Sequence, residues 1–445
     1  MSQTVTDRPE PPKAFRWVVL VLISLAMFGN YYVYDSISPL ADVLKAQLGF
    51  SDSQIGLLNA IYSIPNVFMV LIGGIIIDRI GTRRATVLFG VLCFAGAALT
   101  AVSGHLLPMA TGRLIFGLGA ESLIVAVTTA IAKWFRGKEL SFAFGVNLTI
   151  ARLGSFAALN APSWAASAYE SWQLPLLISV GMGTFCITGA VLYWVLEARA
   201  EARYSLGEES TDKVVWGDLF RFGWSYWYVV ALCITFYSAI FPFQTFAIKF
   251  FMEAHGTSRE VGGGLSSLLT LFAMICTPLF GLLVDRVGRR SLFMMLGSLL
   301  LVPVYLMMAY TRMPQLVLFD VPLPFSDLVF PVYLPMLMMG VAFSLIPAVL
   351  WPSVAYIVEQ GKLGTAYGLM TMIQNIGLAG FNLLIGWAND RWAASAAFPA
   401  GYRAGMWMFS VLGFFGLLFA FLLRRQETGP HAHGLETITV RSSGG

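Results

Sequence analysis

Four ionisable side chains lie inside long apolar stretches of this sequence, namely Asp35, Arg113, Glu121 and Arg152. A charge near the centre of a bilayer costs about 2.5–3.5 kcal/mol on insertion scales, so few are kept there without a use. Glu121 and Arg152 occupy nearly the same depth in neighbouring apolar stretches. A carboxylate and a guanidinium at one depth could bind the two ends of a zwitterionic ligand.

The Glu121–Arg152 pair has two interpretations that the residues themselves leave open. A closed ion pair would bring the charged groups within about 4 Å and would only hold helices together. Two binding poles would need more room, because an extended dipeptide separates its terminal charges by roughly 6–7 Å. With contacts of about 2.8 Å at each end, such poles would lie about 11–12 Å apart. Asp35 and Arg113 are expected to neutralise each other as structural charges in the membrane.

The elements that must position these charges are membrane helices. Of the 445 residues, 57% are hydrophobic and 12% are charged, and the mean hydropathy is +0.73. These values exclude a soluble enzyme, a nucleic-acid-binding protein and a disulfide-rich secreted domain, since a soluble fold could not bury so much apolar surface. A crossing helix needs about 20 apolar residues. Stretches of this length predict an all-α membrane protein with twelve transmembrane helices, at about 16–41, 53–77, 84–104, 108–134, 138–162, 174–197, 223–250, 260–284, 291–311, 328–358, 363–388 and 402–423.

A polar segment divides the twelve helices into two sets of six. The predicted organisation is an N-terminal segment at 1–15, an N-terminal six-helix bundle at 16–197, a linker at 198–222, a C-terminal bundle at 223–425 and a disordered tail at 426–445. Lys and Arg concentrate in cytoplasmic loops. Nineteen of them lie on the side of the termini and the linker and five on the other, so the termini, linker and tail are expected to be cytoplasmic.

One loop motif occurs in both halves. Residues 74–84 read GIIIDRIGTRR and residues 281–290 read GLLVDRVGRR, each between the second and third helices of its half. Internal duplication of six-helix halves is typical of transporters that alternate access to a central site.

These paired loops resemble the signature loop of the major facilitator superfamily, and the resemblance covers the chain from Arg16 to Arg425. It implies two pseudo-symmetric six-helix bundles and a cytoplasmic gate in which an aspartate caps a neighbouring helix. Simple anchoring by positive charge is the alternative role for the loops. The gate residues implied are Asp78, Arg79, Gly81 and Arg83, with Asp285, Arg286, Gly288 and Arg289 in the second half.

Shorter blocks are similar to the family of lysosomal dipeptide transporters within that superfamily: GAES at 119–122, ARLGS at 151–155 and LGTAYG at 363–368. This resemblance implies facilitated diffusion of dipeptides, with Glu121 binding the peptide amino terminus and Arg152 the carboxylate. The N-terminal segment shows no acidic dileucine sorting signal, and the loops at 253–262 and 312–327 lack an Asn-x-Ser/Thr site. A monomer in a bacterial cytoplasmic membrane, without an obligate protein partner, is therefore expected.

Five further residues are candidates for the wall of a substrate cavity: Tyr31, Tyr62, Tyr237, Trp351 and Asn375. Each lies inside a predicted helix and could supply a hydrogen bond or an aromatic surface for peptide side chains. Packing between helices is the alternative role of each.

The sequence thus predicts a transporter of small zwitterionic peptides, with no catalytic group, metal site or cofactor. The first helix lacks the ExxER motif of proton-coupled peptide transporters, which favours uniport. The alternative is an organic-anion carrier, proton-coupled or exchanging, in which Arg152 alone holds a carboxylate and Glu121 carries a proton. A sensor is a further alternative that a flux measurement in liposomes would exclude.

Overall fold

The computed structural model describes residues 9–135, 139–204, 206, 222–310, 330–359, 362–430 and 432–438. Most of the predicted linker and the loop at 311–329 lie outside the described residues. The long helices of the first half are α1 (Lys13–Asp35), α3 (Asp52–Val102), α4 (Leu106–Phe135), α5 (Leu140–Leu159) and α7 (Gln173–Glu201). Those of the second half are α8 (Trp224–His255), α9 (Arg259–Val287), α10 (Arg290–Tyr310), α11 (Phe330–Ile357), α12 (Leu363–Arg391) and α13 (Arg403–Glu427).

One of these helices, α3, provides two membrane crossings. Its 51 residues would extend for about 76 Å if straight, more than twice the hydrocarbon core of a bilayer. Gly81 interrupts it with a φ of 79° and a ψ of 158°, a backbone conformation that favours glycine, and the chain turns back there. Eleven described stretches are long and apolar enough to cross a bilayer, and the first arm of α3 adds a twelfth. The chain is therefore a multi-pass membrane protein.

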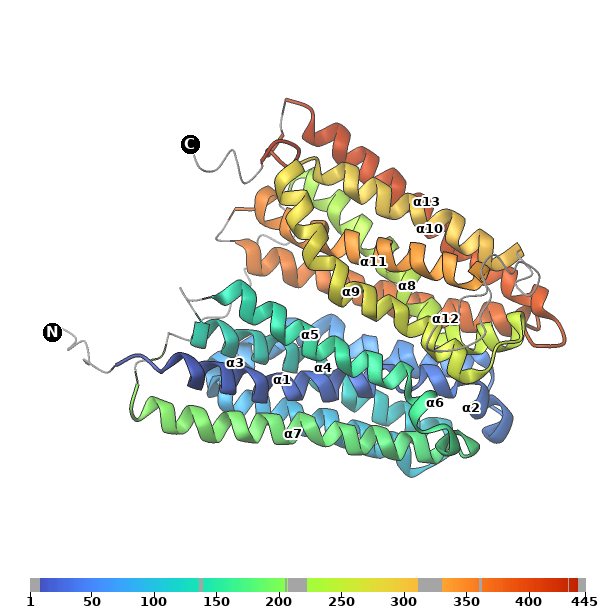
Figure 1. Ribbon diagram of the computed structural model, residues 1–445, viewed down its shortest axis with the longest axis horizontal. Helices are drawn as coiled ribbons and strands as arrows, with labels where there is room; N and C mark the ends of the chain where they lie inside the picture. The colour runs from blue at the N-terminus through green and yellow to red at the C-terminus, as the bar shows by residue number, and fades with distance from the viewer. Residues whose placement is uncertain are drawn as a thin grey trace.

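The helices form two bundles that meet at one end of the molecule and separate at the other (Figure 1). Helices α1 to α7 build the N half, and α8 to α13 build the C half. We call the end at which α3 begins and α12 ends the closed end. The opposite end, at which α1 begins and α13 ends, is called the open end (Figure 1). Asp78 and Gly364 line the cavity described below at this end.

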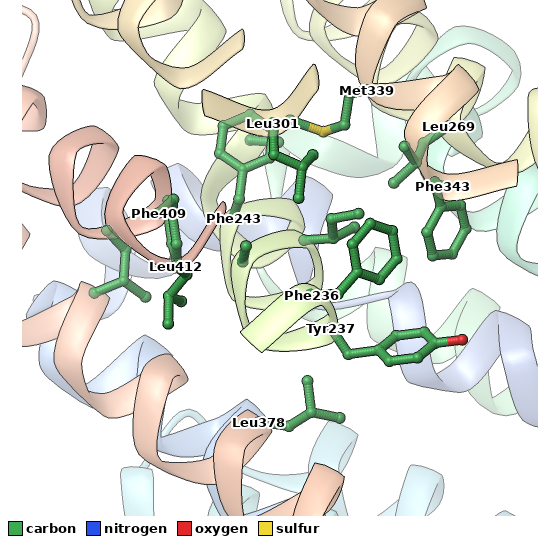
Figure 2. Close-up of a cluster of buried hydrophobic side chains, with 14 of the residues drawn as sticks. Phe236, Tyr237, Phe243, Leu269, Leu301, Met339, Phe343, Leu378, Phe409 and Leu412 are labelled. Carbon is green, nitrogen blue, oxygen red and sulfur yellow. The ribbon is translucent and has the colours of Figure 1, made fainter. Parts of the chain in front are cut away.

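The C half has a core of interlocking aromatic rings between α8, α10 and α13. Phe243 is 2% exposed and makes edge-to-face contacts with Tyr305 and Phe409, with ring centroids 5.5 and 6.2 Å apart. Such pairs stabilise a bundle beyond the effect of area alone. Figure 2 shows this cluster, with the Tyr237 hydroxyl projecting away from Phe243 and Phe409. One face of α8 therefore packs in the core while another remains available for a cavity.

Direct polar contacts join the halves at the closed end. The Ser38 hydroxyl donates to the Gln244 carbonyl at 2.5 Å, and Asn59 donates to the Thr245 hydroxyl at 3.0 Å. The short helix α2 (Ala41–Leu48) adds an ion pair of 2.5 Å between Asp42 and Arg259 of α9. These contacts close the space between the halves at this end.

Part of the segment predicted to be disordered, 426–445, has a defined structure; residues 431 and 439–445 lie outside the described residues. Helix α13 continues to Glu427, and residues 432–438 are described as packed against the start of α10. Leu435 is fully buried, and the Glu436 carboxylate accepts a hydrogen bond from the Ser291 N–H at 2.9 Å. An apolar anchor and a carboxylate at a helix N-terminus explain why these polar residues have a fixed position.

Candidate functional site: a central cavity between the halves

A cavity of about 1160 Å³ lies between the two halves and is lined by both. Its N-half wall comes from α1, α3, α4 and α5, and its C-half wall comes mainly from α8, α11 and α12. The cavity extends from Asp35 and Gln244, near the closed end, to Asp78 and Gly364 at the open end. It is thus a chamber that is blind at one end and wide at the other.

Glu121 and Arg152 both line this chamber. Glu121 makes no hydrogen bond or ion pair with any described residue. The Arg152 guanidinium lies over the Tyr31 ring at 5.5 Å and over the Phe343 ring, which belongs to the C half, at 5.2 Å. The closed ion pair that the sequence left open is therefore not formed between these two residues, and each charge faces a shared space.

Close helix contacts bring Arg152 next to Tyr31. Helix α5 approaches α1 so tightly at Gly154 that a Cβ there would lie 2.2 Å from the Phe28 carbonyl oxygen. Helix α4 approaches the first arm of α3 in the same way at Gly117, where a Cβ would lie 2.3 Å from the Tyr62 carbonyl oxygen. Only glycine allows these two approaches, so the charges on α4 and α5 have defined positions in the wall.

Asp35 and Arg113, which are both described, do not form the ion pair that the sequence predicts. Arg113 instead donates to the carbonyls of Val33, Tyr34 and Leu58 and to the Asn59 side chain at 2.8–3.3 Å. Asp35 lines the chamber beside the Ser155 hydroxyl. The prediction failed because backbone carbonyls satisfy the guanidinium, and this leaves Asp35 as a second carboxylate in the cavity wall.

The C half contributes aromatic groups to its wall. Trp351 donates its indole N–H to the Tyr237 hydroxyl at 2.9 Å, and the Tyr367 hydroxyl donates to the Trp351 carbonyl at 3.0 Å. Tyr237 also stacks on Phe241, with centroids 5.8 Å apart and the ring planes inclined by 9°. All four residues line the chamber. The sequence identified Tyr237 and Trp351 but missed Phe241 and Tyr367.

The remaining predicted wall residues have mixed positions. Tyr62 lines the chamber and packs on Phe116. Asn375 is 1% exposed, lies off the cavity wall and donates to the Thr371 carbonyl of its own helix. Its neighbour Gln374 lines the chamber instead, because adjacent residues on a helix point in directions about 100° apart. Helical periodicity traced from Tyr367 would have selected Gln374.

The predicted gate loops lie at the open end. Asp78 lines the mouth of the chamber, Arg79 is exposed, and Arg83 pairs with Glu201 of α7 at 3.0 Å. Gly81 makes the turn between the arms of α3. In the C half, Asp285 forms an ion pair of 3.2 Å with Arg290. Arg290 was absent from the predicted gate residues.

The other predicted residues of the C-half loop shape its backbone. Gly288 ends α9 with a φ of 69°, and Arg289 follows with a φ of 50°. The side chains of Arg286 and Arg289 are exposed. The Arg289 N–H donates to the Glu436 carbonyl at 3.0 Å, so the segment after α13 holds this loop.

The sequence matches known transporters over most of its length. The model of the Major Facilitator Superfamily matches residues 23–379 and 230–441. The chain is 32% identical over 392 residues to the lysosomal dipeptide transporter MFSD1 of Bos taurus, covering 85% of this chain and 80% of the relative. It is 33% identical over 391 residues to MFSD1 of Mus musculus, covering 85% and 81%. A hexuronate transporter of Escherichia coli (strain K12) is 26% identical over 205 residues, or 46% of each chain.

Solved structures show the same fold. A bacterial homologue of the human lysosomal transporter Spinster, in an inward-facing and unoccupied conformation, superposes with a TM-score of 0.76 at 16% identity, covering 93% of this chain and 98% of that one. The nucleoside transporter NupG superposes with a TM-score of 0.66 at 15% identity, covering 92% and 98%. The chain therefore belongs to the major facilitator superfamily of membrane transporters, in the family that includes MFSD1.

Proposed function

We propose that this chain transports dipeptides, with Glu121 binding the peptide amino group and Arg152 binding the carboxylate. The observation that carries this proposal is that both side chains line one chamber without pairing with each other. Both side chains are half-buried in the chamber wall. A partly desolvated charge without a partner carries a cost that a ligand of opposite charge would offset. A zwitterion supplies both charges at once, which suits two poles of opposite sign.

Arg152 is well suited to a terminal carboxylate. Its guanidinium lies over the Tyr31 and Phe343 rings and makes no ion pair with a described residue, which leaves its N–H groups for a planar two-oxygen ligand. Bidentate arginine–carboxylate contacts are among the strongest hydrogen bonds in proteins. We infer that Tyr31 and Phe343 orient this group before the substrate arrives.

The aromatic wall of the C half supports a broad choice of peptide side chains. Tyr237, Phe241, Trp351 and Tyr367 offer faces and hydroxyls but no charge. Such surfaces accept apolar, polar and cationic side chains alike. We therefore propose a general dipeptide transporter in which recognition depends on the two termini.

The transport mode follows from orientation and shape. The excess of Lys and Arg on the side of the chain termini favours a cytoplasmic open end, in a bacterial inner membrane. The conformation described is then inward-facing, and alternating access requires a second one that opens at the other end. We propose uniport and a monomer, because the first helix lacks the ExxER motif and the chamber lies within one chain.

Uptake of labelled dipeptides and of labelled free amino acids into proteoliposomes tests this function. Glu121→Gln and Arg152→Gln are each expected to reduce dipeptide uptake at least about 100-fold. Each substitution removes the protein's partner for one terminal charge of the peptide, and an unpaired charge in a binding site is strongly discriminated against. Arg199→Gln, which changes an exposed arginine at the end of α7, is the matched control and is expected to leave uptake unchanged. Wild-type protein that carries amino acids but not dipeptides would overturn the proposal.

The same variants distinguish the organic-anion carrier. An anion carrier would keep its flux in Glu121→Gln, with an altered pH dependence, and would lose it only in Arg152→Gln. A dipeptide carrier loses flux in both. A proton gradient imposed across the membrane is expected to leave the dipeptide equilibrium unchanged if the mode is uniport.

A further inference from the structure

The first turn of α3 is bound at the closed end by a carboxylate from the other half. Asp390, in the last turn of α12, accepts hydrogen bonds from the Asp52 N–H at 2.8 Å, the Ser53 N–H at 2.7 Å and the Ser53 hydroxyl at 2.5 Å. The first N–H groups of a helix have no partner within it and attract anions. Asp390 therefore satisfies the start of an N-half helix from the C half.

The two helices touch backbone to backbone at this point. A Cβ at Gly386 of α12 would lie 2.4 Å from the Asp52 carbonyl oxygen, and a Cβ at Gly56 of α3 would lie 2.3 Å from the Asn382 carbonyl oxygen. Each helix thus places a glycine against the main chain of the other. This approach is what allows one carboxylate to reach two main-chain N–H groups.

A buried ion pair reinforces the same helix end. The Asp52 carboxylate pairs with Lys249 of α8 at 2.5 Å, and both side chains are fully buried. The backbone and the side chain of Asp52 are therefore both bound to the C half. This pair is sealed from water, and such a pair is strong while intact and costly to leave half-broken. Asp390 itself is exposed at the rim of the same contact.

The opposite ends of these helices differ. Asp78, near the end of the first arm of α3, and Gly364, in the first turn of α12, both line the open mouth of the chamber. The family resemblance places a gate aspartate at Asp78. At the closed end the roles of the two helices are reversed. There an aspartate near the end of α12, Asp390, contacts the first turn of α3.

We propose that Asp390 is the closed-end counterpart of Asp78, a positioning residue whose cap on α3 holds the transporter in its inward-facing form and must release before the closed end opens. The proposal rests on the alternating access proposed above. It assigns opposite conformational effects to two aspartates on neighbouring helices. It does not depend on which substrate is carried.

Hydrogen–deuterium exchange of the full chain in nanodiscs, without substrate, tests the proposal. Asp390→Asn is expected to increase amide exchange at residues 38–58 and to decrease it at residues 121–135 near the open end. The expected shift in the conformational ratio is at least about 10-fold, since charge-assisted hydrogen bonds are lost. Glu260→Gln, an exposed carboxylate in the first turn of α9, is the control and should leave both regions unchanged.

Amide exchange near the open end distinguishes local loosening around Asp52 from a change in the conformation of the whole transporter. A purely structural role would increase exchange around Asp52 and leave residues 121–135 as they are, and that result would overturn the proposal. Ser53→Ala removes one of the three hydrogen bonds and should shift both regions in the same directions by a smaller amount. It provides the test if Asp390→Asn does not fold.

Three further variants test the direction of the conformational shift. Gly386→Ala adds a methyl group between the helices and should act in the same direction as Asp390→Asn. Asp78→Asn should act in the opposite direction, and the double variant with Asp390→Asn should return towards the wild-type pattern. Amide exchange is measured without a ligand. If the wild-type protein does not transport dipeptides, the proposed function is refuted but this inference is not.

Discussion

The two halves share a fold but line the chamber with different chemistry. The N half supplies the charges of its deep part, with Asp35, Glu121 and Arg152 on α1, α4 and α5. Both halves supply aromatic rings, such as Tyr31 and Tyr62 from the N half and Tyr237 and Trp351 from the C half, but none of the described C-half residues that line the chamber is charged. A duplicated architecture therefore does not imply a duplicated site. Under the proposed function, the charged wall would bind the termini of a ligand and the uncharged wall would accommodate its variable parts.

The difference extends to what lies behind each wall. In the N half, Arg113 binds three main-chain carbonyls and a side-chain amide, which ties α4 to α1 and α3. In the C half, the packing behind α8 is an aromatic core around Phe243 (Figure 2). Directional hydrogen bonds suit a wall that must place charges accurately. Ring packing suits a wall that only needs shape.

The largest expected effect comes from removing the directional support in the N half. Arg113→Met should lower the free energy of unfolding by about 3 kcal/mol, because several hydrogen bonds to one charged group are lost. Thermal unfolding in detergent measures this, with exposed Arg199→Met as the control. An unchanged melting temperature would show that the two walls do not differ in how they are supported.

The next effect sharpens the role of the charged wall. Arg152→Lys keeps the positive charge but loses the planar group that contacts Tyr31 and Phe343, so dipeptide transport should fall about 100-fold, or about 2.7 kcal/mol. Initial uptake rates in proteoliposomes measure it. The melting temperature should remain close to wild type, and equal transport would mean that only charge matters at this position.

A smaller effect is expected at the aromatic wall. Trp351→Phe keeps a ring but removes the hydrogen bond to the Tyr237 hydroxyl, and transport should fall about 5-fold, corresponding to about 1 kcal/mol. The loss should be greater for dipeptides with large side chains than for dialanine. An equal loss for both would contradict a division between termini and side chains.

The smallest effect concerns the loops at the open end. The N-half loop is held by Glu201 of α7, whereas the C-half loop is held by Glu436 of the segment after α13. Glu436→Gln should cost about 0.5 kcal/mol of stability, typical of a charge lost at a helix N-terminus, and leave transport unchanged. Differential scanning fluorimetry measures the former. A loss of transport would give this segment a role in the cycle.

Particular residues show where prediction from sequence succeeds and fails. The glycine at position 81 and the repeated motif correctly located the turns between second and third helices, because a polar loop needs no distant partner to be recognised. The pairing of Asp35 with Arg113 was wrong, because the partners of Arg113 are carbonyls that carry no sequence signature. Asn375 was selected instead of its neighbour Gln374, which lines the cavity, because the residues chosen from sequence were not checked against the face of α12 that the cavity uses.

The sequence by itself determined that the chain crosses a membrane twelve times in two related halves, because apolar length and charge bias are local properties. It also selected Glu121 and Arg152, since charge at membrane depth is costly wherever it occurs. Only the tertiary structure decided that these two side chains face one chamber without pairing, and that Asp390 binds the start of α3 some 340 residues away along the chain. Those facts depend on backbone approaches at glycines, which neither residue type nor spacing records.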